Sequence, residues 1–206
     1  MNLVLIRHGK SVWNLENKFT GWYDIELAPE GMIEAEKAAS FLADNEFKPD
    51  VCFTSYLQRA NKTLEIILNH MPVKMVKDIE IIKSWKLNER HYGALQGLNK
   101  DDTKNKYGEQ KFLEWRRSYN IPPPILDEDS IMNPKKDPIY ENENTDELPL
   151  TECLKDTYDR VVPYWTSEIK PLILEKDVMI AAHGNSLRAL CKFLFDIEDD
   201  DIVNLE

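Results

Sequence analysis

Four short apolar runs mark the strands that the chain is expected to form. They lie at residues 3–6, 51–54, 79–87 and 178–182. Continuous apolar runs, such as residues 3–6 and 178–182, are typical of parallel strands that are buried on both faces. Segments with helical spacing alternate with them, which indicates an α/β fold with a mostly parallel central sheet and helices on both faces.

The spacing of apolar residues also predicts the helices. One opens at Pro29 and one follows Ser55, and further helices are expected over residues 103–117, 151–169 and 186–195. Proline suits a first helical turn, Ser55 is the expected cap of the second helix, and Asp101 or Asp102 that of the third. Pro163 should bend the fourth helix rather than end it. The expected inward-facing residues of the first and last helices are Met32, Ala35, Ala39, Leu42, Leu187, Leu190, Cys191 and Leu194.

Residues 119–150 follow neither pattern. Six of the eleven prolines and many acidic residues lie there, which predicts a long irregular excursion over the surface. Such segments commonly form the lids or walls of sites. A linker between two domains is the alternative, but too little chain follows to build an independent domain. We therefore expect residues 1–206 to form a single domain.

Composition excludes several classes of protein. With 42% hydrophobic and 31% charged residues, the chain has an ordinary globular composition, and it contains neither a membrane-spanning apolar run nor an N-terminal signal peptide. A cytoplasmic location is therefore expected. The net charge of −11 argues against nucleic acid or an anionic membrane as a partner, but not against an anionic small molecule. Cys52, Cys153 and Cys191 are expected to be reduced core thiols.

Two histidines follow the first and the last apolar run in the same local pattern. The first run ends in Arg7-His8-Gly9 and the last in His183-Gly184. Because the carboxyl ends of parallel strands meet at one edge of a sheet, we expect both histidines in one site.

The other polar groups near these histidines are mostly arginines. Arg7 adjoins His8, Arg59 lies in a first helical turn, and others stand on loops or at helix ends, namely Arg90, Arg116 and Arg117. Converging fixed cations favour phosphoryl transfer, in which His8 would attack phosphorus while Arg7 and Arg59 hold the oxygens. His183 would donate a proton or a hydrogen bond. Because the arginines supply the charge, no metal is expected. The seven glycines are scattered and form no phosphate-binding loop, so a nucleotide cofactor is not expected either.

Glu89 is the best carboxylate for acid or base chemistry at the substrate oxygen. It follows the third strand, and burial beside a phosphoryl group is expected to raise its pKa. The alternative is a purely structural salt bridge, for example with Arg90.

These residues resemble those of the histidine phosphatase superfamily, which is marked by Arg-His-Gly at 7–9 and His-Gly at 183–184. Longer stretches are similar to the cofactor-dependent phosphoglycerate mutases, and they follow the family's order over nearly the whole chain. They are Phe19-Thr20-Gly21-Trp22, Thr54-Ser55 with Arg59-Ala60, residues 85–100, Trp115-Arg116-Arg117-Ser118-Tyr119 with Pro122 to Pro124, and residues 181–189.

The resemblance implies a phosphoglycerate mutase-like three-layer α/β/α sandwich. The implied reaction interconverts 3-phosphoglycerate and 2-phosphoglycerate, and 2,3-bisphosphoglycerate primes it by leaving a phosphoryl group on His8. The implied catalytic residues are His8, Glu89, His183, Arg7 and Arg59. The implied substrate-binding residues are Asn14, Thr20, Gly21, Tyr92, Lys100, Arg116, Arg117, Gly184 and Asn185. A homodimer or homotetramer is also implied.

The sequence departs from the family's pattern at two places. Lys10 stands where these mutases usually have glutamate, and members of the family continue past the position of Glu206 with a strand and a tail over the site. We therefore expect an intact chain heavier than 24.1 kDa.

Two other functions compete with the mutase. A histidine phosphatase acting on a phosphorylated metabolite would share the chemistry at His8, but it would not require the second cationic group of Lys100, Arg116 and Arg117. A catalytically silent binding or scaffold protein could keep the same fold. Since His8, Glu89 and His183 are all present, the sequence does not favour lost chemistry.

Overall fold

A parallel sheet forms the centre of the computed structural model, which describes residues 1–205. Within that range its strands are β1 (Leu3–Arg7), β2 (Val51–Thr54), β3 (Glu80–Lys83) and β4 (Val178–Ala182). Their order across the sheet is β1-β4-β2-β3, and each neighbouring pair is parallel. All four carboxyl ends therefore point toward the same edge, where the predicted histidines lie.

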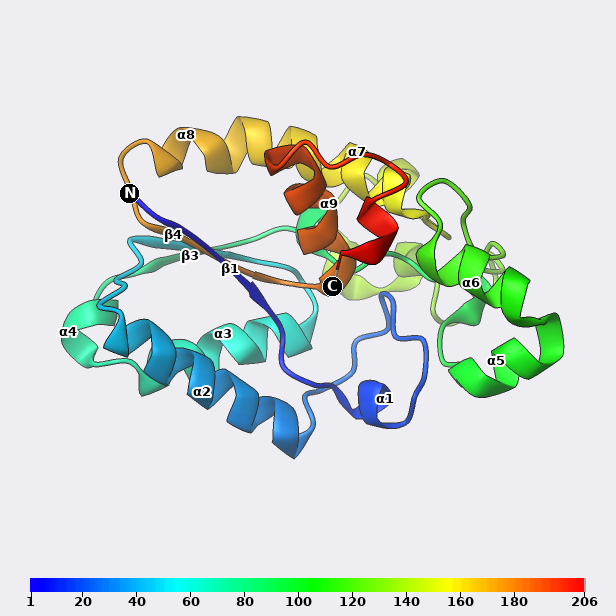
Figure 1. Ribbon diagram of the computed structural model, residues 1–206, viewed down its shortest axis with the longest axis horizontal. Helices are drawn as coiled ribbons and strands as arrows, with labels where there is room; N and C mark the ends of the chain where they lie inside the picture. The colour runs from blue at the N-terminus through cyan, green and yellow to red at the C-terminus, as the bar shows by residue number, and fades with distance from the viewer. Residues whose placement is uncertain (206) are drawn as a thin grey trace.

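Alternate residues of the central strand β4 are buried on opposite faces of the sheet. Met179 and Ala181 of β4 pack on one side with α2 (Pro29–Asp44) and α3 (Gln58–His70). Val178 and Ile180 pack on the other side with α7 (Leu154–Tyr164) and α9 (Gly184–Leu194). Figure 1 shows α2 and α3 below the sheet and α7 to α9 above it. Because side chains alternate along a strand, this arrangement needs apolar residues at every position, and the predicted three-layer sandwich is confirmed.

The prediction of one continuous helix over residues 103–117 is wrong. Two helices lie there, α5 (Lys100–Tyr107) and α6 (Glu109–Arg117), and Gly108 separates them with φ +83°. A left-handed φ of this kind ends a helix and suits glycine. Asn99, rather than Asp101 or Asp102, caps α5, since its side chain accepts hydrogen bonds from the amides of both aspartates.

Pro163 lies inside a long helical rod and does not end it. After α7 the chain forms a π-helical turn, Trp165–Ile169, and continues as α8 (Lys170–Ile173). Proline has no N–H for the regular helical ladder, so the rod lacks one of its hydrogen bonds at this position. The rod begins at Leu154, three residues later than predicted.

Several local predictions need correction. Met32 is 37% exposed, because the small Gly31 takes the inward position of the first turn of α2. Leu57, not Ser55, is the N-cap of α3. The third strand ends at Lys83 and a 3-10 turn follows it at Trp85–Leu87. Leu187, Cys191 and Leu194 are only half-buried, whereas Leu190 is buried. Two one-turn helices were not predicted, α1 (Val12–Leu15) and α4 (Val73–Val76).

Residues 119–150 take the irregular path that the prolines predicted. Their only helical pieces are the 3-10 turns Pro134–Lys136, Pro138–Tyr140 and Thr145–Glu147. Tyr140 and Leu148 are buried in one cluster with Trp22 and Trp85. This packing holds the segment close to Trp85, which lies four residues before Glu89. Among the described residues, no helix has the length and apolarity needed to cross a membrane.

Candidate active site

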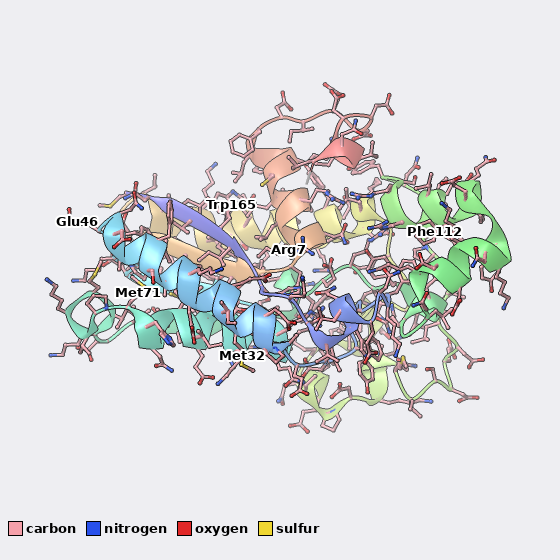
Figure 2. All side chains as sticks on the ribbon, turned by 60° about the horizontal axis from the view of Figure 1, so that its bottom comes forward. Arg7, Met32, Glu46, Met71, Phe112 and Trp165 are labelled. Carbon is pink, nitrogen blue, oxygen red and sulfur yellow. The ribbon has the colours of Figure 1, made fainter. Side chains whose placement is uncertain are left out.

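Four segments bring the predicted site residues to the carboxyl edge of the sheet. His8 follows β1, Arg59 lies in the first turn of α3 after β2, Glu89 lies beyond β3, and His183 follows β4. Figure 2 shows Arg7 where β1 ends, with Phe112 of α6 to one side of it. The site is thus assembled from residues that are up to 175 positions apart in the chain.

His8 is held as a neutral imidazole with one nitrogen free of hydrogen. Its Nδ1 lies 2.6 Å from the carbonyl oxygen of Gly9, and because a carbonyl can only accept, Nδ1 carries the hydrogen. Nε2 is then unprotonated and accepts a 3.4 Å hydrogen bond from Nε of Arg59. Burial lowers the pKa of His8 to about 3, and the charge of Arg59 acts in the same direction. The ring therefore presents a nucleophilic nitrogen at neutral pH.

His183 stands behind His8 rather than on the cavity wall. The two ring centroids are 4.9 Å apart, and Nε2 of His183 is 2.7 Å from Oγ of Ser55. His183 is fully buried, and this burial holds its pKa well below the usual value, with the charge of Arg59 acting likewise. A neutral imidazole keeps one N–H, so His183 can donate a hydrogen bond but carries no charge.

Arg59 is a buried cation fixed by main-chain carbonyls. Its guanidinium donates hydrogen bonds to the carbonyls of Gly21 and Tyr23 at 2.7 and 3.1 Å. Only 1% of the surface of Arg59 is exposed. Burial lowers its pKa to about 10, so it remains charged at neutral pH. The guanidinium of Arg59 is therefore already oriented beside Nε2 of His8.

Glu89 is held in its ionised form in the protein without a phosphoryl group on His8. Burial pushes the pKa of its carboxyl upward, but hydrogen bonds from the amides of Arg90 and Asn185, at 2.7 and 3.1 Å, together with the charge of Arg59, lower it below the usual value. The rise in pKa that was predicted for a site with a phosphoryl group on His8 stays a prediction, and the sequence does not reveal the two amides that lower the pKa without that group. Arg90 contacts Glu89 through its main chain here.

One cavity of about 440 Å³ joins nearly all of the predicted residues. Of the predicted set, His183 alone does not line it. The predicted residues on its wall are Arg7, His8, Asn14, Thr20, Gly21, Arg59, Glu89, Tyr92, Lys100, Arg116, Arg117, Gly184 and Asn185.

The far side of the cavity is also cationic. Lys100 begins α5 and Arg116 and Arg117 end α6, so these helices bring cations toward the sheet edge from the side (Figure 1). Burial lowers the pKa of Lys100, and the charge of Arg116 contributes. Nδ2 of Asn185 donates to the Tyr92 hydroxyl at 3.3 Å, which ties α9 to this wall.

Sequence reasoning missed several residues of the site. Arg188 lines the cavity and donates to the side chain of Asn185 at 3.2 Å; its place three residues after Asn185 on α9 was the available signal. Lys18 also lines the cavity. Ser55 was interpreted as a helix cap but contacts His183. Gln96 accepts from the Trp22 amide at 2.6 Å, and no sequence pattern indicated that contact.

No cluster of three or more His, Cys, Asp or Glu side chains among the described residues is placed to hold a metal ion. Within residues 1–205, Glu89 is the one carboxylate on the cavity wall, facing seven lysine and arginine side chains. Such a wall favours an anionic ligand with more than one charged group.

Solved structures resemble this chain in fold. A mycobacterial glucosyl-3-phosphoglycerate phosphatase in complex with VO3 superposes with a TM-score of 0.71 at 21% identity, covering 99% of this chain and 86% of that one. A structure described as mycobacterial hydrolase 1 gives a TM-score of 0.72 at 21% identity, with 99% and 83% coverage. At this level of identity the similarity concerns the fold.

Sequence relatives are much more similar. The 2,3-bisphosphoglycerate-dependent phosphoglycerate mutases of Borreliella burgdorferi and Borrelia garinii are each 53% identical over 204 residues, which is 98% of this chain and 81% of theirs. Residues 3–133 match the histidine phosphatase superfamily (branch 1). The chain therefore belongs to the 2,3-bisphosphoglycerate-dependent phosphoglycerate mutase family of the histidine phosphatase superfamily.

Proposed function

We propose that this chain interconverts 3-phosphoglycerate and 2-phosphoglycerate through a phosphoryl group carried on Nε2 of His8. The observation that carries the proposal is a neutral, oriented imidazole at a cavity where cations outnumber carboxylates. Phosphoryl transfer depends mainly on positioning and on neutralising the charge of the phosphoryl oxygens, and such a cavity provides both.

The residues present fit 2,3-bisphosphoglycerate, which would supply the phosphoryl group that primes His8. The cations come from two directions, with Arg7 and Arg59 beside His8, and Lys100 and Arg116 on the side of α5 and α6. A molecule with two phosphates and a carboxylate matches that distribution, whereas a monophosphate would leave one cationic group without a counter-charge.

The hydrogen bonds at Glu89 support a cycle that starts from its carboxylate form. With a phosphoryl group on His8, the substrate hydroxyl oxygen attacks phosphorus, the N–P bond breaks, and Glu89 accepts the hydroxyl proton. In the return half, Nε2 of His8 attacks the other phosphoryl group while Glu89 gives its proton to the departing oxygen. Atoms and protons balance over the two halves, and Glu89 returns to its ionised form.

Arg7, Arg59 and His183 are proposed to hold the phosphoryl oxygens during both halves. Arg59 needs no reorientation, because its carbonyl partners already fix the guanidinium. His183, kept neutral by burial, would donate one hydrogen bond, and Ser55 would fix its ring. Preorganised donors of this kind stabilise charge that develops in the transition state.

The experiment is to incubate the protein with 2,3-bisphosphoglycerate and to measure the mass of the peptide that contains His8. We expect the mass of one phosphoryl group on that peptide, together with mutase turnover. His8→Ala should lose both while its thermal unfolding shows a folded protein. Undiminished mutase turnover in His8→Ala would contradict the proposed mechanism.

A histidine phosphatase is the second candidate, because the superfamily contains such enzymes and a phosphatase shares this fold. Lys100, Arg116 and Arg117 favour the mutase, since a transferred molecule must stay bound through a second anionic group. Phosphate release measured beside isomerisation separates the two activities. Release of one phosphate per substrate consumed, without isomerisation, would favour the phosphatase.

The assembly state also stays a prediction. The family resemblance implies a homodimer or homotetramer, which light scattering on the purified protein would test.

A further inference from the structure

The segment that carries Glu89 lies outside the sheet and the long helices. After the 3-10 turn at Trp85–Leu87, residues 88–92 have no regular structure, so their main-chain groups need partners other than a helix or strand ladder. Several of those partners come from Glu152, just before α7, and from Arg160 within α7. This origin is unexpected, because α7 contributes no residue to the cavity wall.

Arg160 of α7 binds this segment at two main-chain carbonyls. Its Nη1 donates to the carbonyl of Lys86 at 2.7 Å and its Nη2 to the carbonyl of Glu89 at 2.9 Å. The indole Nε1 of Trp22 donates to the same Glu89 carbonyl. The main chain of Glu89 is therefore held from two directions while its carboxylate faces the cavity.

Glu152 fixes Arg160 and completes the attachment. Its carboxylate accepts from Nε and Nη2 of Arg160 at 2.7 and 2.9 Å, and also from the amide of His91 at 2.8 Å. The amide of Glu152 in turn donates to the carbonyl of His91 at 2.8 Å. The segment is thus bound on both sides of Glu89, at residues 86 and 91.

This ion pair is buried, unlike most others in the molecule. The side chains of Arg160 and Glu152 are 7% and 3% exposed, whereas the Lys155–Asp159 pair on the same helix is more than half exposed at both ends. A buried pair is stable only when geometry and further hydrogen bonds satisfy both charges, and here the main chain of the Glu89 segment supplies those bonds.

We propose that Arg160, oriented by Glu152, is a positioning residue for Glu89: its planar fork fixes the main chain from which the carboxylate reaches the substrate. The inference rests on the proposed function, in which Glu89 moves the substrate proton. Positional errors of about 1 Å in catalytic groups cost about a hundredfold in rate, which makes such a support consequential.

Three variants test the proposal. Arg160→Lys keeps the charge opposite Glu152 but cannot reproduce the fork that reaches both carbonyls. Arg160→Met removes the charge as well. Val161→Ala is the matched control, because Val161 is the next residue of α7, is 1% exposed, and packs in the same apolar cluster as Leu87 but has no polar group that could hydrogen-bond to the main chain of the Glu89 segment.

Each variant is assayed well below its unfolding temperature, and two quantities are measured. The first is mutase kcat and KM, for which we expect Arg160→Lys to lose about tenfold or more in kcat, a fraction of what a general acid or base contributes, with KM within about threefold. The second is amide hydrogen exchange of residues 86–91, which should become at least about tenfold faster. Val161→Ala should lower the unfolding temperature and leave both quantities unchanged.

Wild-type kcat in Arg160→Lys, or an equal loss of kcat in Val161→Ala, would overturn the positioning role. Unchanged exchange of residues 86–91 in both Arg160 variants would overturn the structural premise. If the wild-type protein shows no mutase turnover, the proposed function fails, and the exchange measurement alone decides whether Arg160 holds the Glu89 segment.

Discussion

At the scale of single residues, the surroundings of His8 and Glu89 fix different charge states for the two groups. The nucleophile is kept uncharged and the proton carrier is kept charged. His8 stays neutral because burial and Arg59 disfavour its charged form. Glu89 stays ionised because two main-chain amides and Arg59 outweigh its burial. The ionised Glu89 is the form that the first half of the proposed cycle requires, and the neutral His8 is the nucleophile that priming and the return half require.

Glu89→Gln tests the proton transfer. The substitution preserves shape and one acceptor oxygen but removes the basic carboxylate, so kcat should fall by about 10²–10⁴-fold with little change in the unfolding temperature. Steady-state mutase kinetics measure the effect. Glu65→Gln, the same change at an exposed residue of α3 that pairs with Lys62, should keep full activity. A Glu89→Gln enzyme within threefold of wild-type kcat would contradict the assigned role.

At the scale of elements, the His8 loop depends on a close backbone contact with α2. A Cβ on Gly9 would lie 2.2 Å from the carbonyl oxygen of Gly31, and a Cβ on Gly31 would lie 2.2 Å from that of Lys10. The carbonyl of Lys10 also accepts from the amide of Ala28 at 2.9 Å. The first turn of α2 thereby fixes the residues that follow His8, including the carbonyl that orients its ring.

Gly31→Ala should therefore damage both stability and catalysis. The added methyl group meets backbone atoms that cannot turn away, and such overpacking costs about 1–3 kcal/mol. Urea unfolding gives the change in free energy, and kcat should fall because the carbonyl of Gly9 moves.

Gly108→Ala is the control for a glycine substitution. Gly108 has φ +83° and ψ 157° but nothing within 4 Å of an added Cβ, so only the backbone penalty of about 1–3 kcal/mol for this glycine conformation applies. We expect this variant to keep its kcat. Equal activities in the two variants would refute the role of the α2 contact.

At the scale of the whole molecule, buried histidines make stability depend on pH. Burial lowers the pKa values of His8 and His91 to about 3 and holds that of His183 well below its usual value. Below about pH 6.5 the unfolded chain binds protons at these residues that the folded protein does not bind. The free energy of unfolding must therefore fall as the pH falls from about 6.5 toward 3.

Urea unfolding between pH 6.5 and 5 measures this dependence. Three such groups give a slope that approaches about 4 kcal/mol per pH unit, since each contributes at most about 1.4. His91→Gln should reduce the slope by about a third. A free energy of unfolding that is constant over this range would contradict the buried, neutral state of the histidines.

Much of the architecture could be predicted because its causes are local. The apolar runs of β1, β2 and β4 predicted strands that are covered on both faces, and the two His-Gly pairs predicted one shared edge. Errors arose where a single residue changed the outcome, as at Gly108, which divides the helix expected over residues 103–117. The resemblance added the substrate-binding residues, which periodicity could not have identified.

The sequence by itself determined the order of strands and helices along the chain, the cationic character of the site and the two histidines that follow β1 and β4. These features depend on residues close together in the chain. Only the tertiary structure decided that Ser55 contacts His183, that Arg160 binds the main chain of Glu89, and that the pKa of Glu89 is lowered in spite of its burial. The physical reason is that burial and hydrogen bonding compete at each group, and partners distant in sequence decide the balance.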